Sequence, residues 1–295
     1  MIGWFDANLV SILNGFAIGS LLFILAVGLS IVFGMMDVLN LAHGAIYLAG
    51  AYLGVQFAGG VSSWTGFLTA LVAAALFGLL AGAVLSTMTE PLAKRPHLDQ
   101  ALLTLGVALV VAEVLAIIYG NDVLRINAPP GLDSSVSVLG NTYPSYRLAL
   151  IGVGAVIAVA VYVVVERTSV GALVRASVAD REMVSTMGID NRKVKVAVLG
   201  VGSALAAVAG VLGGPIYSAR PGLDETVLIL ALVVIVIGGL GSIKGALVGA
   251  LVIGQVESLG RALVPDLASF VLFGALALVL IVRPRGLFGA KVTAA

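Results

Sequence analysis

The chain of 295 residues contains no cysteine, and charged residues make up only 11% of it. The missing thiols exclude disulfides, thiolate metal sites and a cysteine nucleophile. Soluble globular domains typically carry about 25% charged residues, so the low charge content excludes that class. A net charge of +1 lacks the excess of positive charge that is typical of nucleic-acid-binding proteins.

Motifs for catalysis are also missing. No GxxxxGK[ST] loop is present, so ATP hydrolysis by this chain is not expected. The two histidines, His43 and His97, have no partner pattern typical of a Ser/His/Asp nucleophile set. We therefore expect a protein that is not an enzyme, with no catalytic residues, no cofactor and no metal site.

The first ten residues, MIGWFDANLV, lack Lys and Arg and so lack the basic start of a signal peptide, which predicts that the N-terminus is retained.

Long hydrophobic runs dominate what is present, at 60% hydrophobic residues and a mean hydropathy of +1.16. A bilayer core about 30 Å thick requires roughly 20 helical residues per crossing. The sequence therefore predicts an all-α polytopic membrane protein of about eight transmembrane helices, forming one transmembrane domain over residues 1–295. The candidate runs are 8–34, 38–59, 64–88, 100–119, 147–165, 196–217, 227–260 and 267–282.

The distribution of positive charge predicts how the chain is oriented. Six of the sixteen Lys and Arg residues lie in 166–195, and cytoplasmic loops of membrane proteins are enriched in these residues. Placing 89–99, 166–195 and the C-terminal tail in the cytoplasm gives eleven positive residues inside and four outside. This orientation predicts an external N-terminus and an external, periplasmic loop at 120–146.

Two segments resemble each other as apolar helices interrupted by glycine, at 28–54 and 234–254. Irregular backbone at membrane depth persists only where protein or an aqueous cavity surrounds it, and broken helices are typical of transporter substrate sites. Whether 227–260 crosses twice or is re-entrant stays open. The candidate residues for a translocation pathway or gate are Gly34, Asn40, His43, Gly44, Gly239, Gly241, Ser242 and Lys244.

Ionisable residues within the apolar runs have two interpretations each. His43 is either a pathway group or a structural hydrogen-bonding partner of a freed carbonyl. Glu113 is either a pathway group or a residue that hydrogen-bonds between helices or lies near the interface. Glu257 is a third such residue, and the sequence alone assigns it no role.

The segment RASVADREMVSTMGID, residues 175–190, has small and methionine residues at helical spacing, and Gly188 then supplies a helix stop. Small residues and flexible thioethers suit a groove on a partner protein. An amphipathic helix lying on lipid headgroups is the alternative. The candidate docking residues are Arg175, Ala176, Ala179, Asp180, Met183, Met187 and Gly188.

Three motifs in the same order carry a family resemblance: GLSIVFGMMDVLNLAHGAIYLAGAY at 28–52, RASVADREMVSTMGID followed by SALAAVAGVLGGPIY within 175–217, and GGLGSIKGALVG at 238–249. With the tail VRPRGLFG, they resemble the permeases of branched-chain amino acid ABC importers, of the Liv type and nearer its H-type subunit. The resemblance covers nearly the whole chain.

The resemblance implies a multi-pass permease in the plasma or inner membrane of a bacterium or archaeon. Its partners would be a second permease, either a homologue or a second copy, two ATP-binding cassette subunits and a periplasmic substrate-binding protein. Residues 175–188 would form the cytoplasmic coupling helix. The outer loop from Asn121 to Tyr146 would meet the substrate-binding protein.

Two features depart from the family pattern, and they bear on the substrate. Lys244 stands where a proline is expected in the Gly-rich turn, and residues 89–96 form a loosened version of an acidic-basic loop. The substrate is a branched-chain amino acid or, alternatively, urea, a short amide or another small carboxylate. An ATP-independent secondary transporter or channel is the alternative class, and a membrane scaffold without a transport path is a further one.

Overall fold

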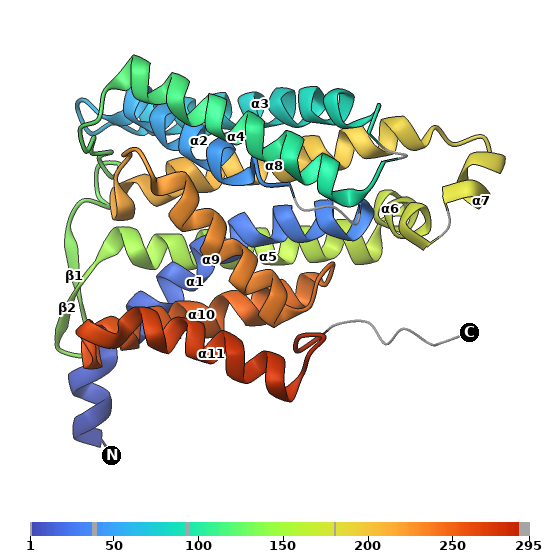
Figure 1. Cartoon of the computed structure of the whole chain (residues 1–295). Helices are drawn as coiled ribbons and strands as arrows, with labels where there is room; N and C mark the ends of the chain where they lie inside the picture. The colour runs from blue at the N-terminus through green and yellow to red at the C-terminus, as the bar shows by residue number, and fades with distance from the viewer. Residues whose placement is uncertain (1, 37–39, 93–94, 180, 289–295) are drawn as a thin grey trace.

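A computed structural model describes residues 2–36, 40–92, 95–179 and 181–288. Helices account for nearly all regular structure in these residues, and the only strands they contain form one short hairpin (Figure 1). The elements are α1 (Ile2–Met36), α2 (His43–Ala58), α3 (Trp64–Thr89), α4 (His97–Tyr119), β1 (Ser135–Val138), β2 (Asn141–Pro144), α5 (Ser145–Arg167), α6 (Ser169–Ala179), α7 (Arg181–Thr186), α8 (Asn191–Tyr217), α9 (Leu223–Gly238), α10 (Ile243–Leu263), the 3-10 turn η1 (Pro265–Leu267) and α11 (Ala268–Val282).

Seven helical segments in the described residues are long and apolar enough to cross a membrane: α1, α3, α4, α5, α8, α10 and η1 with α11. The all-α polytopic class is therefore confirmed. The short helices α2 and α9 have 16 residues each, about 24 Å at 1.5 Å per residue. The predicted run 227–260 is divided, because α9 ends at Gly238 and α10 begins at Ile243.

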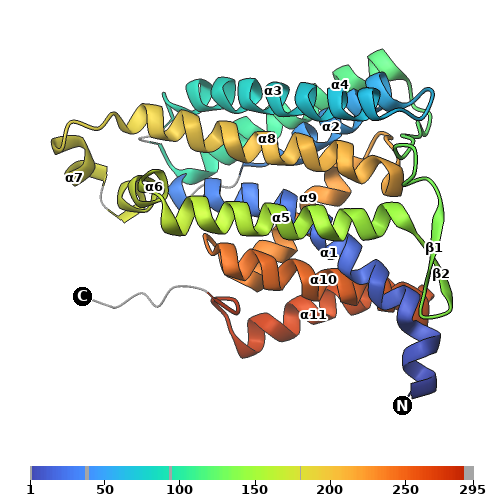
Figure 2. The ribbon, with the colours of Figure 1, turned by 180° about the vertical axis from the view of Figure 1, so that it is seen from behind.

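The long helices lie side by side, so that the connections gather at two ends of the bundle (Figures 1 and 2). The start of α1 and the β1–β2 hairpin lie at one end, whereas α6, α7 and the last turn of α11 lie at the other. The predicted external and cytoplasmic segments are thus separated in space. Which end faces the cytoplasm stays a prediction from the charge distribution.

The core consists of α1, α2 and α8, with α10 packed along α1. The most apolar windows of α1 and α8 are 78% and 67% buried, against 11% for α4 and α5 and 6% for α11, which identifies the peripheral helices. Glycine permits close backbone contact in this core. A Cβ on Gly28 of α1 would lie 2.6 Å from the Gly202 carbonyl oxygen of α8, a clash with backbone.

The hairpin within residues 120–146, the loop predicted to be external, was not predicted from the sequence. β1 and β2 pair antiparallel from Ser135 opposite Pro144 to Val138 opposite Asn141. Leu139 and Gly140 form the two-residue turn with φ of +47° and +84°, and positive φ at both central positions suits the twist of paired strands. The sequence signal was weak because a leucine occupies the first turn position, where Asn, Asp or Gly is usual.

Candidate coupling and gating site

The predicted Gly-rich interruption is a tight turn between α9 and α10. Gly239 and Gly241 have φ of +105° and +75°, a region that side chains other than glycine rarely adopt. Ser242 caps α10, because its hydroxyl accepts a hydrogen bond from the Gly245 amide at 3.0 Å. We call residues 239–242 the inner turn.

The two glycine-interrupted segments meet at this turn. A Cβ on Gly34, near the end of α1, would lie 3.2 Å from the Cα of Gly241, so the two backbones are in contact. Neither residue can gain a side chain here without displacing the other backbone. The structure thus brings together two candidate gate residues that are 207 positions apart in the sequence.

The segment after α11 clamps the inner turn, which the sequence analysis missed. Leu287 donates its amide to the Ile237 carbonyl at 2.8 Å, and Phe288 donates to the Gly238 carbonyl at 2.9 Å. These bonds satisfy carbonyls at the end of α9 that lack partners within the helix. Gly286 has φ +78°, and a Cβ there would lie 2.6 Å from the Gly239 nitrogen. The Pro-Arg-Gly sequence after α11 was the available signal for this turn.

The structure describes the predicted docking segment at 175–188 as α6, which begins earlier, at Ser169, and ends at Ala179, and α7, which covers Arg181–Thr186. Asp180 lies outside the described residues, so a continuous helix over 175–188 stays a prediction. Gly188 follows α7 with φ +81°, in agreement with the predicted stop.

Candidate docking residues in this segment lie on the molecular surface. Met183 and Met187 are 60% and 67% exposed, which is high for side chains of this hydrophobicity. Ala176 is also exposed, whereas Val184 is buried and anchors α7. Ala176 lies on α6 and Met183 on α7, on either side of Asp180, so the predicted stripe across both segments stays a prediction.

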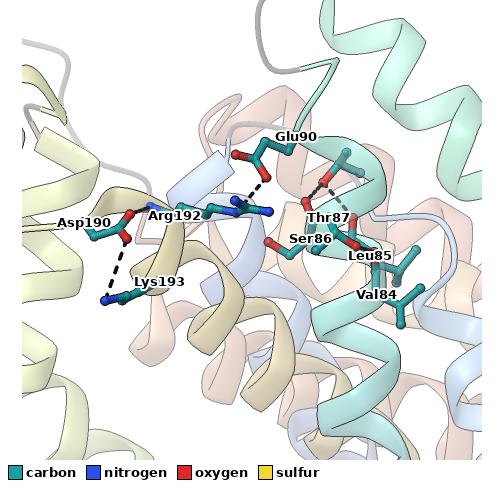
Figure 3. Close-up of polar contacts among 9 residues, drawn as sticks. Val84, Leu85, Ser86, Thr87, Glu90, Asp190, Arg192 and Lys193 are labelled. Atoms are coloured by element: carbon teal, nitrogen blue, oxygen red, sulfur yellow. Dashed lines mark hydrogen bonds and ion pairs between the residues drawn. The ribbon is translucent and has the colours of Figure 1, made fainter.

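An ion pair ties the end of this segment to α3 (Figure 3). Arg192, in the first turn of α8, lies 2.9 Å from the Glu90 carboxylate at the end of α3. Asp190 caps α8 by accepting the Arg192 amide at 2.9 Å, and Lys193 lies 4.0 Å from Asp190 (Figure 3). Both members of the Arg192–Glu90 pair are exposed, so the pair contributes at most about 1 kcal/mol to stability. Its effect is to orient the chain entering α8.

A small cavity joins the docking segment to the inner turn. It has a volume of about 160 Å³, and its lining includes Ser30 and Gly34 of α1, Val174 and Arg175 of α6, and Gly241. Arg175 also donates to the Val165 carbonyl and lies 3.9 Å from Glu166, both on α5. The two residue sets that the sequence predicted separately therefore adjoin at the inner end of α1.

Asn40, His43 and Gly44, the described candidates that follow the first interruption, are buried. His43 is fully buried, with Nε2 2.9 Å from the Leu25 carbonyl oxygen. Asn40 is 3% exposed and accepts the Ala42 amide at 3.1 Å. Gly44 packs against α9, where a Cβ would lie 2.9 Å from that of Leu228. These contacts favour the structural interpretation of His43, and a pathway role for the three residues stays a prediction.

Lys244 is exposed just beyond the inner turn, and its ammonium nitrogen lies 5.6 Å from the centroid of the Tyr162 ring on α5. A cation over an aromatic face is favourable. The lysine at the position where a proline was expected therefore makes one favourable contact with α5. Among the described residues, no group of His, Cys, Asp and Glu is arranged to hold a metal ion.

The fold defines a multi-pass helical membrane protein. The model of the family described as the branched-chain amino acid transport system / permease component matches residues 11–281, and the chain belongs to that family.

Curated relatives match along nearly the whole chain. The permease protein LivH of the high-affinity branched-chain amino acid transport system of Salmonella typhimurium is 28% identical, covering 94% of each chain. BraD of Pseudomonas aeruginosa, described in the same terms, is 28% identical over 95% of each. A probable LivH of Methanocaldococcus jannaschii is 29% identical, covering 84% of this chain and 80% of its own.

A solved structure, PsaBC from Streptococcus pneumoniae in complex with Fab, has a chain of similar fold. The TM-score is 0.52 at 16% identity, and the match covers 96% of this chain and 95% of that chain. At this identity the likeness concerns the fold alone.

The inner turn generates a first prediction, with a matched control. Gly241→Val adds a side chain at φ +75° and against Gly34, so we expect loss of transport with the protein still inserted in the membrane. Gly120→Val introduces a similar strain at φ +79°, where nothing lies within 4 Å of the added carbon, and transport should persist. The measurement is substrate uptake per unit of membrane-inserted protein. Normal uptake by Gly241→Val would exclude a gating role for the contact.

Proposed function

We propose that this chain is a permease subunit that imports branched-chain amino acids in an ATP-binding cassette transporter of a bacterial or archaeal inner membrane. The family match over 11–281 is the observation that carries this proposal. The relatives are named as permease proteins of branched-chain amino acid transport, which supports the same substrate class here. ATP hydrolysis is then the work of separate cassette subunits.

The exposed Met183 of α7 and Met187 just after it support docking of a cassette subunit at the end of the bundle assigned to the cytoplasm. Met183 and Met187 offer flexible apolar side chains that adapt to a groove. A membrane-surface helix would favour bulkier Leu, Phe or Trp on its apolar face, where this segment has alanines and methionines. The docking interpretation therefore accounts better for this segment.

The cavity between α6 and the inner turn suggests how docking reaches the pathway. Closure of the cassettes on ATP would displace α6, and α6 lines the same cavity as Gly34 and Gly241. A shift of α6 would then move Gly34 and Gly241 apart or bring them back into contact. In this mechanism the inner turn opens and closes the cytoplasmic end of the pathway by alternating access.

The exposure of Glu113 is the observation that favours a second permease subunit packed beside α4. It is exposed on a helix whose apolar window is only 11% buried, and it has no hydrogen bond or ion pair within the described parts of the chain. A carboxylate facing hydrocarbon is costly, so this face of α4 is expected to meet protein or a water-filled path. A homologous permease or a second copy of this chain satisfies that requirement.

The outer loop is the expected contact for a periplasmic substrate-binding protein. Leu139 at the tip of the β1–β2 hairpin is 82% exposed, and Val136 on β1 is also exposed. Apolar side chains on a hairpin that projects from the bundle suit recognition by another protein.

Reconstitution tests the proposal against an ATP-independent carrier. The permease is purified with its copurifying subunits and placed in proteoliposomes, and uptake of labelled L-leucine, urea and acetamide is followed with and without ATP. Leucine uptake that requires ATP and a substrate-binding protein is expected. Uptake without ATP would establish the carrier or channel alternative, and uptake of urea or acetamide in place of leucine would correct the substrate.

Docking through α7 generates a second prediction. Met183→Asp places a charge in an apolar interface, where an unpaired buried charge costs about 3–5 kcal/mol, so copurification of the cassette subunit should fail. Val61→Asp makes the same change at a residue 89% exposed in the α2–α3 connection, whose neighbours Gly60 and Ser62 bond to Asn127 and Ala128 of the predicted outer loop, and it should leave the assembly intact. Both variants should insert normally, because neither charge lies in a spanning helix. Normal cassette binding by Met183→Asp would favour the lipid-surface interpretation of α7.

A further inference from the structure

A second cavity lies between α9, α10 and α11, away from the inner turn. Its volume is about 250 Å³, and its lining includes Glu257, Arg261, Thr226 and Ser269. The first turns of α9 and α11 and the last turns of α10 surround it, so it lies toward the end of the bundle that carries the β1–β2 hairpin. Pockets for drug-sized ligands have about 300–1,000 Å³, so the occupant of this cavity is small.

A buried carboxylate with unused hydrogen-bonding capacity lines this cavity. Glu257 has a side chain only 4% exposed, and one carboxylate oxygen accepts from Arg261 Nη2 at 2.6 Å. The other oxygen, Oε2, is buried and has no hydrogen-bond partner in the described part of the chain. A buried acceptor left unpaired is costly, so this carboxylate favours a further donor.

Arg261 and the opposite wall supply complementary groups. The Arg261 side chain is 62% exposed, so most of its five N–H donors stay available beyond the bond to Glu257. Ile229 and Leu230 of α9 and Leu272 and Phe273 of α11 form an apolar wall to the cavity. One cavity thus combines an acceptor for a cation, donors for a carboxylate and an apolar surface.

We propose that this cavity is a transient subsite for a zwitterionic, branched aliphatic amino acid entering the permease, an assignment that rests on the proposed function. The ligand ammonium donates to the Glu257 carboxylate, the ligand carboxylate accepts from Arg261, and the side chain packs on Ile229, Leu230, Leu272 and Phe273. No other described cavity combines a buried, unpaired carboxylate oxygen with an available guanidinium. The i,i+4 spacing of Glu257 and Arg261 on α10 holds both groups toward the same ligand.

Direct binding tests the subsite on the assembled permease and cassette subunits without the substrate-binding protein. L-Leucine binding is measured by saturation-transfer NMR, with 4-methylpentanoate, which lacks the ammonium group, as a competitor. The intact complex should bind leucine and be competed by L-valine, while 4-methylpentanoate competes at least about tenfold more weakly, since a hydrogen bond to a charged group is lost.

Glu257→Gln should weaken leucine binding about tenfold or more and abolish the discrimination against 4-methylpentanoate. Glu225→Gln is the matched control, because Glu225 is an exposed acid on the first turn of α9 that does not line the cavity. It should bind leucine as the parent does.

Phe273→Ala keeps the proposal testable if Glu257→Gln fails to assemble. Removal of the ring enlarges the apolar wall and should shift the ratio of leucine to valine binding at least about threefold, a change that a purely structural ion pair does not predict. Unchanged affinity and selectivity in whichever of these two variants assembles would overturn the subsite.

Uptake by the complete transporter distinguishes failure of the subsite from failure of the proposed function. ATP-dependent leucine uptake by the parent, together with unchanged binding in Glu257→Gln, would leave the proposed function standing and the subsite refuted. A parent complex that imports no branched-chain amino acid would refute both.

Discussion

Helix backbones approach one another at glycine in this bundle because lipid supplies no hydrophobic force to hold helices together. Association then depends on van der Waals packing, which is best where no side chain separates the backbones. Gly28 meets Gly202 between α1 and α8, and Gly50 of α2 lies against Ala207 of α8. Longer side chains at these positions would separate the three core helices, and the peripheral helices that rest on them would lose their support.

The same close approach at the inner turn links architecture to transport. Gly34 and Gly241 touch without side chains between them, and the segment after α11 holds the turn from the other side through Gly286. A contact made of backbone alone can form in few geometries. Displacement of α6 would therefore either shift Gly34 and Gly241 to another such geometry or separate them. Glu257 and Arg261 lie on the same helix, α10, toward its other end, so one helix connects the proposed subsite to the proposed gate.

Hydropathy predicted the helix boundaries well, because the length of a membrane crossing follows from bilayer thickness. The expected run 64–88 became Trp64–Thr89, and 267–282 became Ala268–Val282. Contacts between distant segments were not predictable, and they include the Gly34–Gly241 pair, the clamp by Leu287 and Phe288 and the Arg192–Glu90 pair. Glu257 and Arg261 were visible at helical spacing, but their cavity depends on α9 and α11.

Thermal unfolding of purified glycine variants in detergent tests most directly whether close backbone approach holds the bundle together. A Cβ at Gly50 would lie 2.7 Å from the Ala207 Cα, so Gly50→Ala should lose about 1–3 kcal/mol of stability and unfold at lower temperature. Gly152→Ala on α5 has nothing within 4 Å of the added carbon, and it should match the parent or gain up to about 1 kcal/mol from helix propensity. Equal melting temperatures for the two variants would contradict the account.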